Sequence, residues 1–244
     1  MNNYDYKSFK IGSNYQLDDL HLKTLSGMFQ QPCQPCSAVL GGRSAVIQVF
    51  LHGIGSVVVK QYTRGGLLRH VLKRYYLRTG KMRCEQEYDF TYLLHTLGIN
   101  IPEPIAFASK GRLFYQAWLI TREIPNVLPL SKLEPQVNSH FEDIMDSFVN
   151  QVSSLVENFI FHPDLHPGNA LVDSSNRVFL LDFDKANVYQ GSKQRLAQKY
   201  LQRWQRAVLK HGLDQSLEIS FRKKFEIPKR SLKSIAKEAR DKKN

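Results

Sequence analysis

The apolar residues in the first half of the chain follow the spacing of β-strands. Residues 38–49 read as a strand, a glycine turn and a second strand, and residues 56–62 form another apolar run after a turn at 53–55. Residues 112–123 alternate enough for one or two further strands. Strands joined by such short turns form an antiparallel meander. This half of the chain therefore predicts a small antiparallel sheet.

Helical spacing dominates elsewhere. Four apolar residues fall at i, i+3, i+4 and i+7, namely Phe90, Leu93, Leu94 and Leu97. This spacing predicts an amphipathic helix over 83–97 that buries the four residues and ends at Gly98. A short basic helix is predicted over 67–77, and longer helices are predicted over 141–159 and 192–210.

Two prolines, Pro125 and Pro129, separate the strand-rich half from the helix-rich half and make a natural hinge. The 244 residues are 42% hydrophobic, which is enough for a substantial core. The pattern predicts an α+β protein of two lobes. A small antiparallel-sheet lobe would occupy 1–124 and a mainly helical lobe 125–244.

Composition favours a cytoplasmic protein. The polar start of the chain lacks the apolar core of a secretory signal, and no apolar run approaches the ~20 residues that span a bilayer. Three cysteines cannot all pair, which suits a reducing compartment. Cys33 and Cys36 form a C-x-x-C interleaved with prolines, but no second ligand pair follows. An ordinary loop is therefore favoured there over zinc or redox chemistry.

A predicted hairpin carries the residues of greatest chemical interest. Two short apolar strands, 170–172 and 178–181, are joined by an Asp-Ser-Ser-Asn turn. Closing the hairpin brings Asn169, just before the first strand, near Asp182, just after the second. Asp164 lies five residues upstream on the same loop. Two carboxylates and an amide oxygen then converge, which supplies one base and two hard oxygen ligands for Mg²⁺, as phosphoryl transfer requires.

The pattern H-x-D-x-x-x-x-N followed by D-F-D resembles the catalytic loop and metal motif of the protein-kinase-like superfamily. The spelling D-L-H-P-G-N is similar to the small-molecule branch, which includes aminoglycoside and choline kinases. The resemblance implies a bilobal protein-kinase-like fold that uses ATP and Mg²⁺. It also implies that Asp164 is the base for the acceptor hydroxyl, that Asn169 binds one Mg²⁺, and that Asp182 bridges Mg²⁺ to the phosphates.

A kinase of this type also needs a strand lysine and a helix glutamate that holds it. Lys60 ends a valine run, and Glu87 lies on the predicted buried stripe of its helix. A buried carboxylate is costly unless it is paired, so Lys60 is the expected partner of Glu87. Glu85 is the alternative register.

A glycine-containing run provides a candidate phosphate loop, made of Gly41, Gly42, Arg43 and Ser44. Its backbone amides could approach phosphates, although the run lacks the full G-x-G-x-x-G. An ordinary hairpin turn explains it nearly as well.

Further segments are similar in order and spacing to the 3-deoxy-D-manno-octulosonic acid (Kdo) kinases of the Kdo/WaaP lipopolysaccharide kinase family, over roughly 39–210. They include V-V-V-K-Q-Y-T-R-G-G-L-L at 57–68, R-T-G at 78–80, I-P-E-P at 101–104, R-L-F-Y at 112–115, L-I-T-R-E-I-P at 119–125 and L-Q-R-W-Q-R at 201–206. The chain departs from the family at Ser44, at His166-Pro167-Gly168 and at Tyr200.

This resemblance implies ATP-dependent phosphorylation of the 4-hydroxyl of Kdo on a lipid A precursor, at the cytoplasmic face of a Gram-negative inner membrane. It also gives a use to the net charge of +12, because basic residues could bind the anionic membrane surface peripherally. These residues are the Lys/Arg-rich tail and Arg64, Arg69, Lys73, Arg74 and Arg78.

Three alternatives remain open: a lipopolysaccharide kinase acting on heptose, an aminoglycoside-type phosphotransferase, and a catalytically silent pseudokinase that binds anionic membrane. A nucleic-acid partner is not predicted, since the sequence shows no aromatic-basic platform for RNA.

Overall fold

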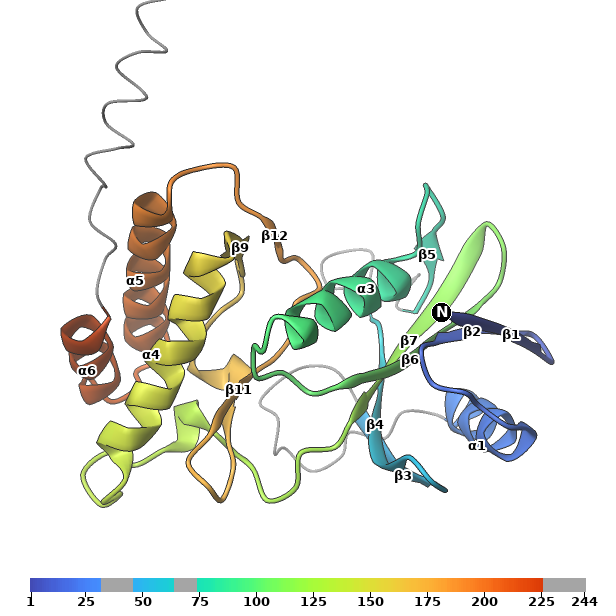
Figure 1. Ribbon diagram of the computed structural model, residues 1–244, viewed down its shortest axis with the longest axis horizontal. Helices are drawn as coiled ribbons and strands as arrows, with labels where there is room; N and C mark the ends of the chain where they lie inside the picture. The colour runs from blue at the N-terminus through green and yellow to red at the C-terminus, as the bar shows by residue number, and fades with distance from the viewer. Residues whose placement is uncertain (32–45, 64–73, 226–244) are drawn as a thin grey trace, which may run out of the picture.

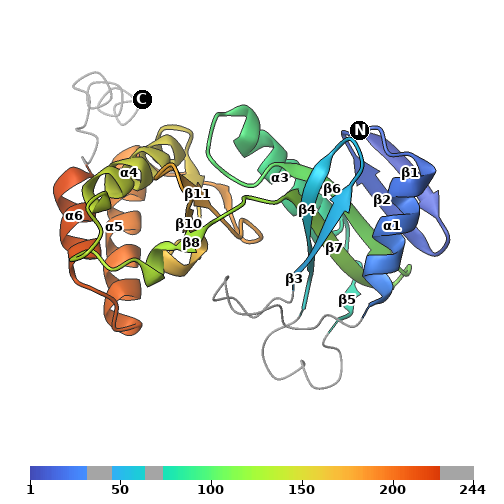
Figure 2. The same ribbon diagram turned by 90° about the horizontal axis from the view of Figure 1, so that it is seen from below.

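The computed structural model describes residues 1–31, 46–63 and 74–225. The candidate phosphate loop (Gly41, Gly42, Arg43, Ser44), Cys33 and Cys36, most of the predicted helix at 67–77 and the basic tail lie outside the described residues. The described chain is an antiparallel sheet followed by a mostly helical part, and the two lie side by side (Figures 1 and 2). The α+β class predicted from the sequence is confirmed.

In its described residues, the sheet part has seven strands and two helices. They are β1 (Asn2–Tyr6), β2 (Phe9–Ser13), α1 (Asp19–Gln30), β3 (Val46–Leu51), β4 (Gly55–Gln61), β5 (Tyr76–Leu77), α3 (Arg83–Thr96), β6 (Pro104–Lys110) and β7 (Phe114–Arg122). The strand order is β1-β2-β6-β7-β4-β3, with β5 on β7, and every pairing is antiparallel.

Helices α1 and α3 cover opposite faces of this sheet (Figure 1). Strand side chains alternate between faces, and β7 shows the consequence: Trp118 packs in the cluster with α1, whereas Leu119 packs in the cluster with α3. On β4, Val57 and Val59 belong to the α1 cluster. Lys60, one residue further on, therefore faces α3.

Up to residue 225, where the described residues end, the helical part is built on three helices and a small hairpin. Its elements are β8 (Leu128–Pro129), the 3₁₀ turn η1 (Leu130–Lys132), α4 (Phe141–Glu157), β9 (Ile160–Phe161), the 3₁₀ turn η2 (Pro167–Asn169), β10 (Ala170–Val172), β11 (Val178–Leu180), β12 (Asn187–Val188), α5 (Lys193–Lys210) and α6 (Ser216–Lys224). Phe148 of α4, Trp204 of α5 and Phe221 of α6 pack against one another in one core, with their rings tilted or edge-on. The predicted hairpin is present, with Ala170 opposite Leu180.

Two sequence predictions were wrong. Leu93 and Leu97 are 45% and 41% exposed, so they are not on the buried stripe of α3. That helix instead packs Cys84 and Tyr88 against the sheet, where Tyr88 contacts Phe107, and it also buries Thr91 and Leu94. The end of the predicted helix at 67–77 is strand β5, in which Tyr76 pairs with Tyr115 of β7.

Sequence reasoning also missed several elements, namely β1, β2, α1, β6 and α6. The polar start of the chain contributes two strands because the whole of β2 pairs with β6, from Phe9 opposite Lys110 to Ser13 opposite Ala106. Within the described ranges, no helix has the length and apolar character needed to cross a membrane.

Candidate active site

A strand lysine, a helix glutamate and a hairpin aspartate meet between the two parts. Lys60 Nζ lies 3.4 Å from Glu87 Oε1 on α3 and 2.8 Å from Asp182 Oδ1, just past β11. The expected ion pair between Lys60 and Glu87 is therefore present. Glu85, the alternative register, instead lies 3.8 Å from Lys81 at the surface. We call Lys60, Glu87 and Asp182 the acid-rich cluster, since two carboxylates share one ammonium.

The side chains of Lys60 and Asp182 in the acid-rich cluster are charged near neutral pH. The Glu87 side chain is only 3% exposed, and the Tyr62 hydroxyl donates to its second carboxylate oxygen. Burial alone would lower the pKa of Lys60, but Glu87 and Asp182 outweigh burial and raise it. Burial alone would raise the pKa of Asp182, but the Lys60 charge and hydrogen bond outweigh that and lower it. Lys60 is therefore an ammonium and Asp182 a carboxylate near neutral pH.

Asp182 is held in a left-handed backbone conformation, with φ of 63°. This region is unusual for a residue other than glycine and persists where the surrounding structure over-determines the backbone. The peptide just before it is fixed by a bond from the Leu181 N–H to the Asn169 carbonyl, 2.9 Å. The hairpin thus places Asn169 and Asp182 side by side.

The Asn169 side chain is oriented by the loop that carries Asp164. Its Nδ2 donates to the Asp164 carbonyl at 2.9 Å. Because that bond uses the nitrogen end of the amide, the oxygen end is available to a ligand.

His162 supports this loop from the interior. It is fully buried, and its Nδ1 accepts from the Asp164 N–H at 3.2 Å while its Nε2 lies 2.8 Å from the Leu181 carbonyl. The ring therefore requires the Nε2–H tautomer. Burial lowers the pKa of His162 to about 4, so the ring is neutral near pH 7. It joins the Asp164 loop to the backbone before Asp182.

Tyr200, at one of the departures from the family pattern, supports the same loop. Its hydroxyl accepts from the His162 N–H at 2.9 Å and donates to the Ile160 carbonyl at 2.7 Å. At another departure, His166 Nδ1 accepts from the Gly168 N–H at 3.0 Å and caps η2. Both residues have structural partners within the loop.

Asp164 lies between two cations from the helical part. Lys185 Nζ is 2.9 Å from Oδ2, and Arg203 Nη2 of α5 is 2.9 Å from Oδ1. Burial alone would raise the pKa of Asp164, but the hydrogen bonds and charges of Lys185 and Arg203 outweigh it and lower the pKa. We call Asp164, Lys185 and Arg203 the base-rich cluster, since two cations share one carboxylate.

Sequence reasoning gave no site role to Arg83, Asp184, Lys185 or Arg203. Arg83, at the start of α3, forms a two-point ion pair with Asp184 of the D-F-D segment and so joins the two parts a second time. For Asp184 and Lys185 one signal was available in the sequence, namely that they directly follow Asp182 and Phe183 of the predicted metal motif. Arg203 lies 39 residues from Asp164, and only the packing of α5 brings it close.

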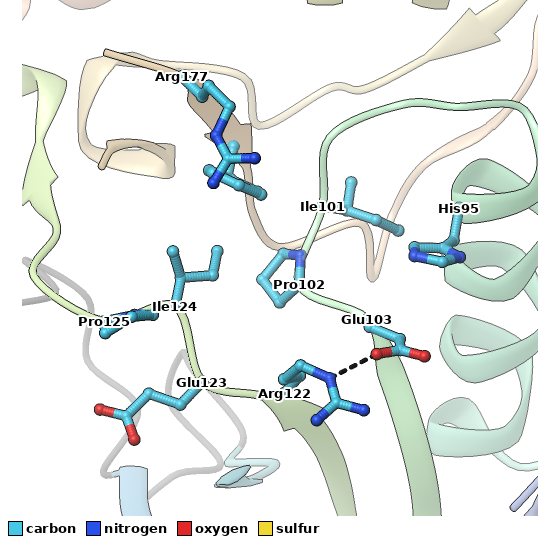
Figure 3. Close-up of a pocket in the computed structure, with 10 residues that line it drawn as sticks. His95, Ile101, Pro102, Glu103, Arg122, Glu123, Ile124, Pro125 and Arg177 are labelled. Carbon is cyan, nitrogen blue, oxygen red and sulfur yellow. Dashed lines mark hydrogen bonds and ion pairs between the residues drawn. The ribbon is translucent and has the colours of Figure 1, made fainter. Parts of the chain in front are cut away.

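A separate cleft lies beside the segment that joins the two parts (Figure 3). Its lining includes Ile101, Pro102, Ile124 and Pro125, and it contains the ion pair between Arg122 Nε and Glu103 Oε2 at 2.5 Å. None of the side chains of the acid-rich or base-rich cluster lines this cleft. It is therefore not the candidate site.

An α+β fold whose sheet and helical part meet at the acid-rich cluster is consistent with a kinase-like protein. Residues 41–226 match the family model described as "Lipopolysaccharide kinase (Kdo/WaaP) family". The match covers most of the chain, which therefore belongs to this family. A kinase family implies ATP as the phosphoryl donor.

Curated relatives agree with the family match. The chain is similar to proteins named 3-deoxy-D-manno-octulosonic acid kinase from Vibrio parahaemolyticus (33% identity, 52% of this chain, 54% of the relative), Vibrio cholerae (30%, 66% and 70%) and Photobacterium profundum (32%, 55% and 58%). The matches thus span between about half and about two thirds of the length of these relatives.

Proposed function

We propose that this protein is an ATP-dependent sugar kinase that phosphorylates the 4-hydroxyl of Kdo on a lipid A precursor. The observation that carries the proposal is that Asp164 of the loop and Asp182 of the hairpin belong to two separate clusters. Lys60 is shared by Glu87 and Asp182, whereas Asp164 is held apart by its own cations. Family membership and the names of the relatives support the same acceptor.

We further propose a bilobal protein-kinase-like fold, with a nucleotide lobe at 1–124 and a catalytic lobe at 125–244. The boundary is supported by a change in strand pairing along the chain. β7 ends at Arg122 within the large sheet, and the next strand, β8, pairs with β10 of the helical part. Two ion pairs, Lys60 with Asp182 and Arg83 with Asp184, cross this boundary.

In this proposal Lys60 binds the phosphates of ATP, and Glu87 holds Lys60 in place. Glu87 suits that role because it is buried and fixed by Tyr62. The run Gly41, Gly42, Arg43 and Ser44 stays a proposed phosphate loop on sequence grounds alone.

The residues present fit Mg²⁺. Mg²⁺ prefers oxygen ligands and usually takes one or two from the protein, with phosphates and water as the rest. Asp182 offers a carboxylate kept ionised, and Asn169 offers the free end of its amide. Among the described residues no set of three His, Cys, Asp or Glu side chains could hold a metal. When bound, Mg²⁺ neutralises charge on the phosphate oxygens.

Asp164 acts as the base. Its carboxylate accepts the proton of the acceptor hydroxyl as that oxygen bonds to the γ-phosphorus. The bond from the γ-phosphorus to the bridging oxygen breaks, and ADP leaves. His162 fixes the Asp164 backbone, so the carboxylate is positioned before the acceptor arrives.

Mass spectrometry of a Kdo–lipid A precursor incubated with the protein, ATP and Mg²⁺ tests the proposed function. The expected result is a gain of one phosphoryl group, located at the Kdo 4-hydroxyl by fragmentation. Parallel incubations with heptose-containing core and with an aminoglycoside test those two acceptors. Phosphorylation of either one in place of Kdo, or of no acceptor at all, would overturn the proposal.

We also propose that the protein binds the anionic cytoplasmic face of a Gram-negative inner membrane peripherally. The net charge of +12 and an anionic lipid acceptor support this, since each basic residue near such a surface contributes about 1 kcal/mol. Binding in liposome sedimentation should require anionic lipid, fall when Arg69, Lys73 and Arg74 become Ser, and be lost at ~1 M salt, where screening is strong. Equal binding to neutral vesicles would contradict it.

A further inference from the structure

The base-rich cluster contains more positive charge than its carboxylate neutralises. Lys185 and Arg203 bond to different oxygens of Asp164, so two cations surround one anion. Within the described chain, no other carboxylate forms an ion pair with either of them. The cluster therefore has a net charge of about +1. This charge surrounds Asp164, the proposed base for the acceptor hydroxyl.

Both cations also have unused donors. A guanidinium carries five N–H donors, and Arg203 has one bond in the described part of the chain, from Nη2. Its Nε is buried there without a hydrogen-bond partner, whereas the side chain as a whole is 30% exposed, so an incoming anion would approach the Nη groups. An ammonium carries three donors, and Lys185, whose side chain is 63% exposed, uses one on Asp164. A second anion could therefore bind both side chains without displacing Asp164.

We propose that Lys185 and Arg203 form an anion subsite that binds a carboxylate of the acceptor beside the hydroxyl to be phosphorylated. This inference rests on the proposed function. The relatives are named for an acid, so the acceptor of those proteins carries a carboxyl group. Arg and Lys bind carboxylates through charge-assisted hydrogen bonds, and Arg can do so at two points. The subsite explains why an acid would be selected over a neutral sugar of similar shape.

The position of the pair favours the acceptor over the transferring phosphoryl group. Lys60 already supplies a cation on the Asp182 side, where the proposed phosphates lie. Lys185 and Arg203 instead contact Asp164, the group that the acceptor hydroxyl must reach. A role on the phosphoryl group would change turnover for every acceptor alike, and this difference makes the two roles separable.

The test compares Kdo with its carboxamide, which keeps the hydroxyls but removes the charge. Binding of each compound is measured by calorimetric titration, and turnover is measured with ATP and Mg²⁺. The variants are Arg203→Gln and Lys185→Gln, the second at a position whose side chain is 63% exposed, against 30% for Arg203. Arg195→Gln is the matched control, because it makes the same change on α5 eight residues away, about 12 Å along the helix.

The wild type and Arg195→Gln should bind Kdo roughly 10- to 100-fold more tightly than the amide, as expected for charge-assisted hydrogen bonds. Arg203→Gln should reduce that preference to about twofold or less, and Lys185→Gln should reduce it in part. The subsite would be overturned if the wild type bound Kdo and the carboxamide equally or bound neither. It would also be overturned if Arg203→Gln kept the preference for Kdo, or if turnover on the two compounds fell equally. Binding as predicted without phosphorylation of Kdo would instead count against the proposed function alone.

Discussion

The acid-rich and base-rich clusters are built from the same kinds of groups in opposite proportion. In the first, Glu87 and Asp182 share Lys60; in the second, Lys185 and Arg203 share Asp164. The first therefore has an excess of negative charge and suits a divalent cation. The second has an excess of positive charge and suits an anionic acceptor. The contrast separates a metal and nucleotide side from an acceptor side.

The two clusters also differ in how the fold makes them. The acid-rich cluster joins β4, α3 and the hairpin, so it exists only when the sheet and the helical part are in place together. The base-rich cluster lies entirely within the helical part. A change in the relative position of the two parts would thus disturb nucleotide binding before it disturbed Asp164.

The largest effect that tests this separation should come from Asp164→Asn. Loss of the base should lower turnover by roughly 100- to 10,000-fold, while Mg-ATP affinity stays within about twofold, because Asp164 contacts no phosphate in the proposal. Steady-state kinetics with the Kdo acceptor measures this. Asp143→Asn, an exposed position on α4, is the control. Near-normal turnover in Asp164→Asn would exclude it as the base.

A smaller effect is expected from Glu87→Gln. The change keeps the shape and the contact with Tyr62 but removes the charge that holds Lys60, so kcat/KM for ATP should fall by about tenfold. Glu85→Gln is the matched control on the same helix, where the carboxylate faces Lys81, and it should change kcat/KM by less than about twofold. Equal effects in both variants would show that Glu87 has no special role.

A third prediction concerns the stability of the fold, and not catalysis, as a function of pH. Because the pKa of His162 is lowered to about 4, the unfolded state binds a proton below pH ~6.5 that the folded state does not bind. Stability should therefore fall as pH is lowered, by roughly 2 kcal/mol from this residue between pH 7 and pH 5. Urea denaturation at the two pH values measures it.

The matched variants separate His162 from other histidines. His162→Gln should flatten the pH dependence, whereas His140→Gln, at an exposed position, should leave it unchanged. His166, whose pKa is also lowered by burial, adds to the same trend. An unchanged pH dependence in His162→Gln would show that the buried ring is not its source.

Local pattern was sufficient for much of the fold and for part of the site. The hairpin could be predicted because its strands and turn are adjacent in sequence, and its closure brings Asn169 beside Asp182. Lys60 and Glu87 could be paired because each was expected to point inward from its own element, and a buried carboxylate requires a partner. These inferences rest on short-range geometry.

Tertiary packing decided the remainder. Strands β1 and β2 lie in a polar segment and are strands because β6 pairs with β2. Arg203 and Arg83 reach carboxylates 39 and 101 residues away, and no local spacing reports such contacts. Leu93 and Leu97 have helical spacing, yet both are exposed, because α3 packs Cys84 and Tyr88 against the sheet.

Calorimetric titration of Mg-ATP into the wild type, Asp182→Asn and Asp164→Asn tests the separation of the two clusters most directly. Asp182→Asn replaces a charged metal ligand by a neutral one. The affinity for Mg-ATP should therefore fall by at least about tenfold, because even residues that only support a metal ligand cause a loss of that size when they are changed. Asp164→Asn should bind Mg-ATP as tightly as the wild type. Unchanged Mg-ATP affinity in Asp182→Asn would contradict the account, and so would equal losses in both variants. Either result would show that the acid-rich cluster does not serve the metal and nucleotide separately from a base-rich cluster that serves the acceptor.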